Sequence, residues 1–176
     1  MTRVLPFAGA AVAGALVLAL CLALTGGAAA EPAAKPAAAR WKAPDGSFSI
    51  STPRGWKAVA TGEAATVLER ADQRGVVVIR RRAAVSDPLE TLAGKLERKL
   101  RRQISDFQPV GSRVATVGGG QGLVYTFVRP RANQVQSVVV APARDRSYTL
   151  DLVADGDAPD VARELAGMVR SFAPRR

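Results

Sequence analysis

The chain has 176 residues, with 25 Lys and Arg against 15 Asp and Glu, which gives a formal net charge of +10 at pH 7. It contains no histidine and a single cysteine. These absences exclude Ser-His-Asp and Cys-His catalysis and leave too few ligands for a zinc site.

The first thirty residues have the three parts of a secretory signal. Arg3 gives a positive start, residues 4–24 carry no charge, and Ala28-Ala29-Ala30 supplies a small-residue end. We predict a signal peptide over 1–30, cleaved after its last alanine, and a secreted or extracytoplasmic protein. Two alternatives stay open: an uncleaved leader that anchors the chain, since the apolar run is near the ~20 residues that span a bilayer, and lipoprotein processing at Cys21.

The next segment reads EPAAKPAAAR, with two prolines and no apolar side chain larger than alanine. Such a segment cannot build a core, so we predict a linker over 31–40 and one domain over 41–173. If the leader is removed, the domain has no cysteine, and its hydrophobic core must hold it without disulfides.

The first half of the domain predicts three strands. Phe48-Ser49-Ile50-Ser51 alternates apolar and polar residues, as a half-buried strand does. Residues 66–70 and 75–82 predict a hairpin around a polar turn. Val76–Ile79 is an unbroken apolar run, which predicts that both faces of that strand are covered.

A helix start follows at Asp87-Pro88-Leu89-Glu90. We expect Asp87 to cap the free amides, Pro88 to take the first helical position and Glu90 to complete a capping box. Apolar residues then recur at spacings of three and four, which predicts one buried stripe. The stripe consists of Leu89, Leu92, Ala93, Leu96, Leu100 and Ile104.

The second half predicts strands over 113–117, 122–128, 135–140 and 147–152, and a last amphipathic helix over 159–172. The order is strands, helix, strands, helix, and the links are short. We therefore predict an α+β domain with a mostly antiparallel sheet covered by two amphipathic helices.

Several segments resemble the PsbP-like domain family. Residues 48–56, FSISTPRGW, resemble its opening F-S-I-x-x-P-x-G-W, and Gly122–Tyr125 after a Gly-rich turn is similar to its mid-domain strand. Tyr148–Leu150 and Val169–Phe172 are similar to its closing strand and helix. The resemblance covers 41 to about 173 and implies a sheet sandwiched between helices.

The resemblance implies non-enzymatic partner binding, because the family includes the PsbP subunit of photosystem II, a Ran-binding transport factor and exported bacterial proteins of unassigned role. Metal contacts in the photosynthetic branch use histidine, which this chain lacks, so no metal or cofactor is expected. The opening motif has a structural interpretation, in which Pro53 and Gly55 make the turn and Trp56 plugs the end of the sheet.

Two groups of basic residues are candidate anion-binding surfaces. Outside the membrane their polyanions would be lipid head groups and wall polymers rather than nucleic acid. An ordinary solvated face is the alternative, and the Glu97–Arg101 spacing fits it too. The candidates are Arg80, Arg81 and Arg82 on a strand and Lys95, Arg98, Lys99, Arg101 and Arg102 on the first helix.

The sequence thus predicts an exported non-enzymatic binding or accessory protein of the cell envelope, with a protein or anionic partner. Alternatives are a basic module for anionic lipid or wall polymer, a structural component with an apolar patch, and a histidine-free hydrolase using paired acids or a Ser-Lys pair. The densest acids, Asp151, Asp155 and Asp157, are interpreted as a strand end and a helix cap. Gly118–Gly122 is no phosphate loop, because a strand follows it.

Overall fold

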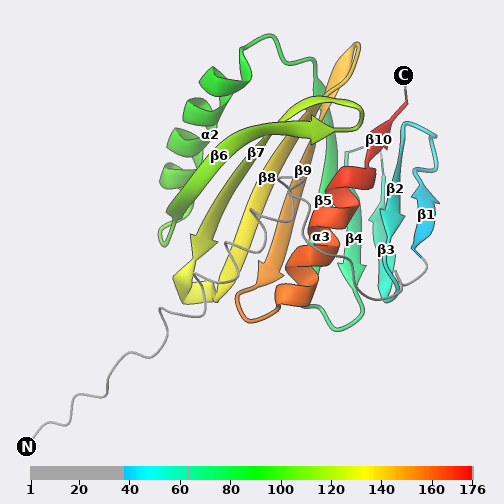
Figure 1. Ribbon diagram of the computed structural model, residues 1–176, viewed down its shortest axis with the longest axis horizontal. Coiled ribbons are helices and arrows are strands. Elements are labelled where there is room, and N and C mark those ends of the chain that lie inside the picture. The colour runs from blue at the N-terminus through cyan, green and yellow to red at the C-terminus, as the bar shows by residue number, and fades with distance from the viewer. Residues whose placement is uncertain (1–37, 63, 176) are drawn as a thin grey trace, which may run out of the picture.

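The computed structural model describes residues 38–62 and 64–175. The predicted signal peptide and most of the predicted linker lie outside the described residues. The elements (Figure 1) are β1 (Ala39–Lys42), β2 (Phe48–Thr52), β3 (Trp56–Thr61), β4 (Thr66–Arg70), β5 (Gly75–Ala83), α2 (Leu89–Gln103), β6 (Gln108–Val117), β7 (Gly120–Arg129), the short 3-10 helix η1 (Pro130–Ala132), β8 (Gln134–Pro142), β9 (Arg146–Asp155), α3 (Pro159–Ser171) and β10 (Ala173–Pro174).

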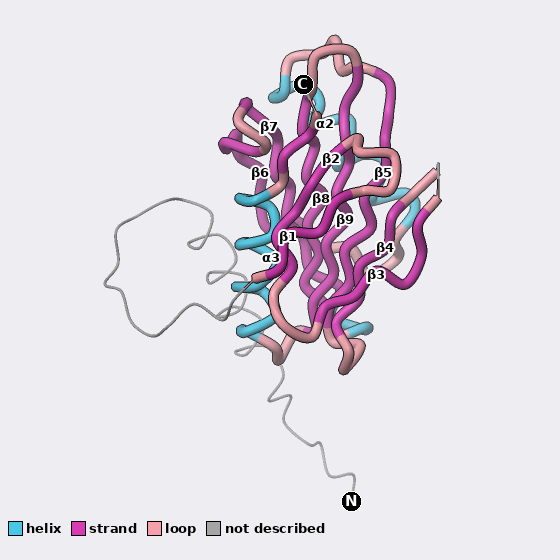
Figure 2. Tube along the Cα trace, turned by 90° about the vertical axis from the view of Figure 1, so that its right-hand side faces the viewer, coloured by secondary structure: helices cyan, strands magenta, loops and turns pink. Residues whose placement is uncertain are grey.

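The main sheet is antiparallel throughout the described part of the chain. Its seven strands there run in the order β3-β4-β5-β9-β8-β7-β6. A smaller antiparallel sheet has the order β1-β2-β10. Figure 2 shows this small sheet in front of the strands of the main one. The fold is therefore α+β with mostly antiparallel pairing, as the sequence predicts.

One face of the main sheet packs against α3 and the small sheet. The predicted stripe of α3 is buried, and Val161, Leu165 and Met168 are each no more than 1% exposed. They join Ile50 of β2 and Leu150 of β9 in one apolar cluster. Burial of large aliphatic side chains at about 1.5–3 kcal/mol each makes this cluster a principal source of stability.

Helix α2 covers the opposite face over β7 and β8. Ala93 and Leu100 pack there against Leu123, Tyr125 and Phe127 in a second cluster. The predicted cap of this helix is wrong. The N-cap residue is Pro88, and no side chain caps it. The Asp87 carboxylate instead accepts a hydrogen bond from Lys95 Nζ at 2.7 Å, because the charged ammonium is a stronger partner than the amides.

In three further places the structure differs from what the sequence predicts. The sequence predicts that both faces of β5 are covered, but Val76 and Val78 are only half-buried. Helix α2 lies over β7 and β8 and leaves the sheet uncovered at β5. Strand β3 was not expected, since an edge strand with five exposed residues carries no apolar alternation. Strand β1 begins at Ala39, so the last two residues of the predicted linker pair with β2.

The opening motif takes the structural role that the sequence predicts. Gly55 adopts a φ of +87°, which suits a residue without Cβ, and Trp56 is 8% exposed at the start of β3. Within the described ranges, no helix is long and apolar enough to cross a membrane.

Candidate anionic-ligand groove

A groove of about 760 Å³ opens between α2 and strands β5, β9 and β8, on the face of the sheet that α2 only partly covers. Its walls are largely apolar. Leu92 and Leu96 contribute from the helix, and Val138 and Val140 contribute from β8. Because α2 does not extend over β5, a space remains between the helix and the half-buried residues of this strand.

Four of the predicted cationic residues meet at this groove. Arg80 and Arg82 are two residues apart on β5, so both side chains point to the same face of the sheet. Lys95 and Lys99 are four residues apart on α2 and share one side of the helix. Strand and helix periodicity thus place two cations on each side of the groove.

Asp151 lies among these cations and forms an ion pair with Arg80. It faces the groove because β5 and β9 pair in a register that sets Asp151 opposite Val78. Burial raises the pKa of Asp151, although the positive charges of Arg80, Arg82 and Lys99 oppose the shift. Asp151 is also the one acidic residue among the described groove-lining side chains.

The four cations differ in how strongly they are already neutralised. Arg80 pairs with Asp151, and Lys95 Nζ lies 2.7 Å from Asp87. Within the described part of the chain, neither Arg82 nor Lys99 has an acidic group within ion-pair distance. These two side chains therefore keep charge that an incoming anion can use.

Three predicted helix residues lie outside the groove. Arg101 donates to Glu97 Oε1 at 2.8 Å and stacks over the Phe107 ring at 5.4 Å. Arg102 Nε donates to the carbonyl of Arg98 at 3.2 Å. These contacts hold Arg101 over Phe107, outside the groove, and Arg102 at the exposed surface of α2, where Arg98 lies too.

Arg81 points to the other face of the sheet, because it alternates with its neighbours along β5. Its Nη1 lies 3.5 Å from Asp45 Oδ2 of the β1–β2 turn. The predicted triplet Arg80-Arg81-Arg82 is therefore not one surface. Two of its members belong to the groove and one to the opposite side.

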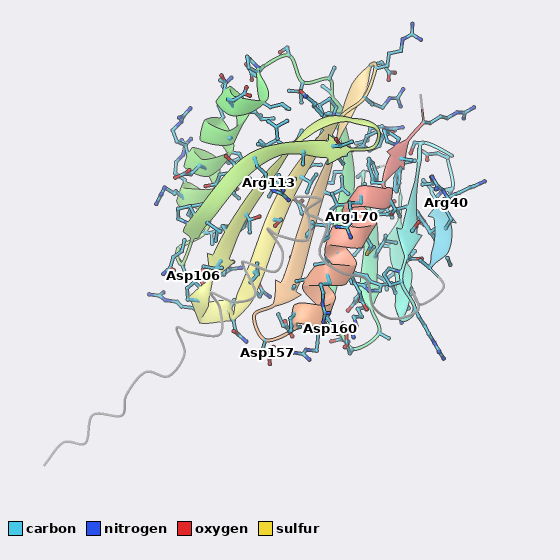
Figure 3. All side chains as sticks on the ribbon, in the orientation of Figure 1. Arg40, Asp106, Arg113, Asp157, Asp160 and Arg170 are labelled. Carbon is cyan, nitrogen blue, oxygen red and sulfur yellow. The ribbon has the colours of Figure 1, made fainter. Side chains whose placement is uncertain are left out.

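The three acids that are dense in sequence do not form one site. Arg74 binds Asp155 at 3.4 Å and Asp157 at 2.6 Å, while Asp151 binds Arg80. Figure 3 shows Asp157 at the end of the sheet where α3 begins. In the described ranges, no group of three or more acidic, His or Cys residues could hold a metal ion.

Sequence reasoning missed Asp151 as a groove residue, together with the polar side chains of Gln136 and Thr149. Strand alternation is enough to predict that the side chains of Arg80 and Arg82 lie on the same face of the sheet. The partner of Arg80 is 71 residues away along the chain, however, and only the β5–β9 pairing brings it close.

Comparison with known proteins gives similarity in structure but not in sequence. No protein-family description and no curated protein matches the sequence. The cyanobacterial PsbP protein CyanoP from Synechocystis sp. PCC 6803 superposes with a TM-score of 0.60 at 14% identity, over 84% of this chain and 98% of that one.

Two other solved structures superpose with a TM-score of 0.51 at 14% identity. One is LpqN, involved in cell envelope biogenesis of Mycobacterium tuberculosis, matched over 80% of this chain and 91% of that one. The other is a Pseudomonas aeruginosa protein of unknown function, matched over 79% and 98%. At such identities the likeness concerns the fold alone. The domain over 39–174 has the PsbP-like fold.

Proposed function

We propose that this protein is a non-enzymatic accessory protein outside the cytoplasm that binds anionic amphiphiles, such as anionic lipids, in the groove beside α2. The observation that carries the proposal is the meeting of Arg80, Arg82, Lys95 and Lys99 over an apolar groove of about 760 Å³. Cations at the rim suit an anionic head group, and the apolar walls from α2 and β8 suit the hydrocarbon next to it.

The location outside the cytoplasm rests on the predicted signal peptide over 1–30. Two structural neighbours support an accessory role in the envelope by analogy: one is a PsbP protein, and the other is described as involved in cell envelope biogenesis. Fold similarity alone does not assign a function, so the groove carries the chemical part of the proposal.

The groove does not favour the hydrolase alternative. Asp151 has no second carboxylate beside it among the described lining residues. The two serines among the groove-lining residues are engaged in the fold. Ser147 Oγ donates to the carbonyl of Ala83 at 2.8 Å, and Ser137 Oγ lies 2.9 Å from Thr126 Oγ1. Recognition therefore fits this arrangement better than acid-base or Ser-Lys chemistry.

Vesicle co-sedimentation tests the proposal. The purified protein should bind vesicles that contain phosphatidylglycerol and should bind phosphatidylcholine vesicles much less. Raising the salt concentration should weaken the binding, because salt screens charges over about 8 Å at 0.15 M ionic strength. The proposal would be contradicted if binding to phosphatidylglycerol vesicles persisted both at high salt and in the Arg82→Glu/Lys99→Glu variant. Preferential binding to a soluble anionic wall polymer would instead favour the polymer alternative.

A further inference from the structure

A second hollow lies on the other face of the main sheet, where the β1–β2 turn, the β8–β9 hairpin and the segment after β10 meet. Figure 1 shows this hairpin and the C-terminal end at the same end of the molecule. Asp157 and Asp160 lie at the opposite end (Figure 3). We call this hollow the arginine cleft, and define its two parts by the residues below.

The inner part is an apolar slot of about 250 Å³. Its described walls include Ala43, Pro44, Phe48, Thr66, Ile79 and Tyr148. The outer part is a mouth of about 630 Å³ that is rich in charged side chains. The two parts share Asp45, Ser47, Arg81 and Tyr148, so the slot opens into the mouth.

Hydrogen bonds to Ser47 hold the walls of the cleft together. Its carbonyl accepts from Tyr148 Oη at 3.0 Å and from the backbone N–H of Arg175 at 2.8 Å. Its own N–H donates to Asp45 Oδ1 at 2.9 Å. The turn, the hairpin strand and the C-terminal segment are thus fixed to one another.

Aromatic packing makes the base of the slot part of the core. The Phe48 ring lies 5.8 Å from that of Tyr148 and 5.4 Å from that of Phe172. All three side chains are less than 10% exposed. The slot is therefore preformed, which lowers the entropic cost of binding a ligand there.

Four arginines line the described part of the mouth: Arg81, Arg144, Arg146 and Arg175. Arg81 lies 3.5 Å from Asp45, and Arg146 Nε donates to Asp145 Oδ1 at 2.8 Å. Within the described residues, Arg144 and Arg175 have no acidic group within ion-pair distance. The mouth therefore keeps a modest positive charge next to an apolar slot.

We propose that the arginine cleft binds a medium-chain carboxylate such as octanoate, with the alkyl chain in the slot and the carboxylate at the mouth. At about 250 Å³ the slot lies just below the ~300–1,000 Å³ of pockets that hold drug-sized ligands, which suits an alkyl chain of several carbons but not a long lipid tail. The planar fork of arginine matches a carboxylate. Asp45 and Asp145 neutralise part of the positive charge of Arg81 and Arg146, so the mouth suits a ligand with a single negative charge.

Calorimetric titration of the full chain with octanoate tests the proposal, with acetate and octanol as the two partial ligands. Octanoate should bind at least about tenfold more tightly than either, because only octanoate supplies both the chain and the charge. In NMR spectra the amide signals of Ser47 and Arg175 should shift. Equal binding of octanol and octanoate would overturn the role of the arginines.

Substitutions locate the site. Arg144→Glu/Arg175→Glu should lower octanoate affinity about tenfold or more, and Ala65→Phe, at the slot wall, should weaken octanoate but not acetate. Arg54→Glu is a control at an exposed turn away from the cleft. Arg82→Glu/Lys99→Glu should leave octanoate binding unchanged, since this cleft does not depend on the groove beside α2. Loss of binding in that groove variant, with retention in the cleft variant, would overturn the proposal.

Discussion

The indole Nε1 of Trp56 donates a hydrogen bond to Glu164 Oε2 at 2.7 Å. This contact joins the first residue of β3 to α3, although the two residues are 108 positions apart. It explains why a tryptophan follows the Pro-x-Gly turn: the ring fills the end of the sheet, and its N–H finds a charged acceptor.

Replacing Trp56 by Phe should lower the free energy of unfolding by about 2–3 kcal/mol, because the substitution removes a hydrogen bond to a charged group and leaves unfilled volume. Glu164→Gln should cost less, about 1 kcal/mol, since the amide oxygen still accepts from the indole. Urea unfolding measures both. Equal losses in the two variants would contradict the importance of indole packing.

Gly75→Ala should destabilise the protein by about 1–3 kcal/mol, as overpacked cores do. A Cβ at this position would lie 2.6 Å from Val161 Cγ1 and 2.8 Å from Trp56 Cη2. Gly120→Ala is the matched control, because its Cβ would meet no atom within 4 Å. Thermal unfolding should show a clear decrease in Tm for Gly75→Ala only. Similar Tm values for the two variants would mean that Val161 and Trp56 move aside at little cost.

Anion binding in the groove should strengthen as the pH falls toward the pKa of Asp151, which lies above the ordinary value of 3.8. Burial raises the pKa of Asp151, so this carboxyl takes up its proton at a higher pH than an ordinary aspartate, and the groove then gains one positive charge beside Arg80, Arg82 and Lys99. Phosphatidylglycerol vesicle binding at constant ionic strength measures this. Asp151→Asn should bind tightly across the same range, and an identical pH profile in both proteins would refute the role of Asp151.

The ion pair of Arg70 and Asp160 should contribute stability that acid removes. Arg70 Nη1 donates to Asp160 Oδ2 at 2.6 Å, and this hydrogen bond lowers the pKa of Asp160. A lowered folded-state pKa stabilises above the unfolded value of 3.8, and the benefit disappears as the pH falls through the folded value. Because Asp160 is half-exposed, Asp160→Asn should cost only about 0.5 kcal/mol at neutral pH.

Urea unfolding at several pH values measures that cost. The difference between Asp160→Asn and the parent protein should shrink toward zero in acid. Gly75→Ala, which destabilises the protein without removing a charge, serves as the control and should show the same loss at every pH. A constant difference at all pH values would argue against the ion pair as its source.

The sequence predicts those parts of the fold where periodicity is strong. Both helices and the strands with alternating burial, such as β2 and β9, follow from apolar spacing. Edge strand β3 and the capping of α2 do not, because exposed edges carry no apolar pattern and Lys95 competes for Asp87. The resemblance to PsbP-like domains correctly anticipated the fold.

The candidate site could be predicted only in part. The sequence identifies the basic residues, and helical spacing places Lys95 and Lys99 together. It does not show that α2 leaves β5 uncovered, nor that β9 brings Asp151 to Arg80. Likewise, the arginine cleft joins segments around residues 45, 81, 145 and 175, which only the folded topology unites.

The most direct test compares two double substitutions that change the net charge equally. Arg82→Glu/Lys99→Glu alters the groove, and Arg98→Glu/Arg102→Glu alters the outer surface of α2. Each basic residue near an anionic membrane contributes about 1 kcal/mol, so the groove variant should lose phosphatidylglycerol binding at least about tenfold. The outer variant should lose much less. Equal losses would show that total charge, rather than the groove, governs binding.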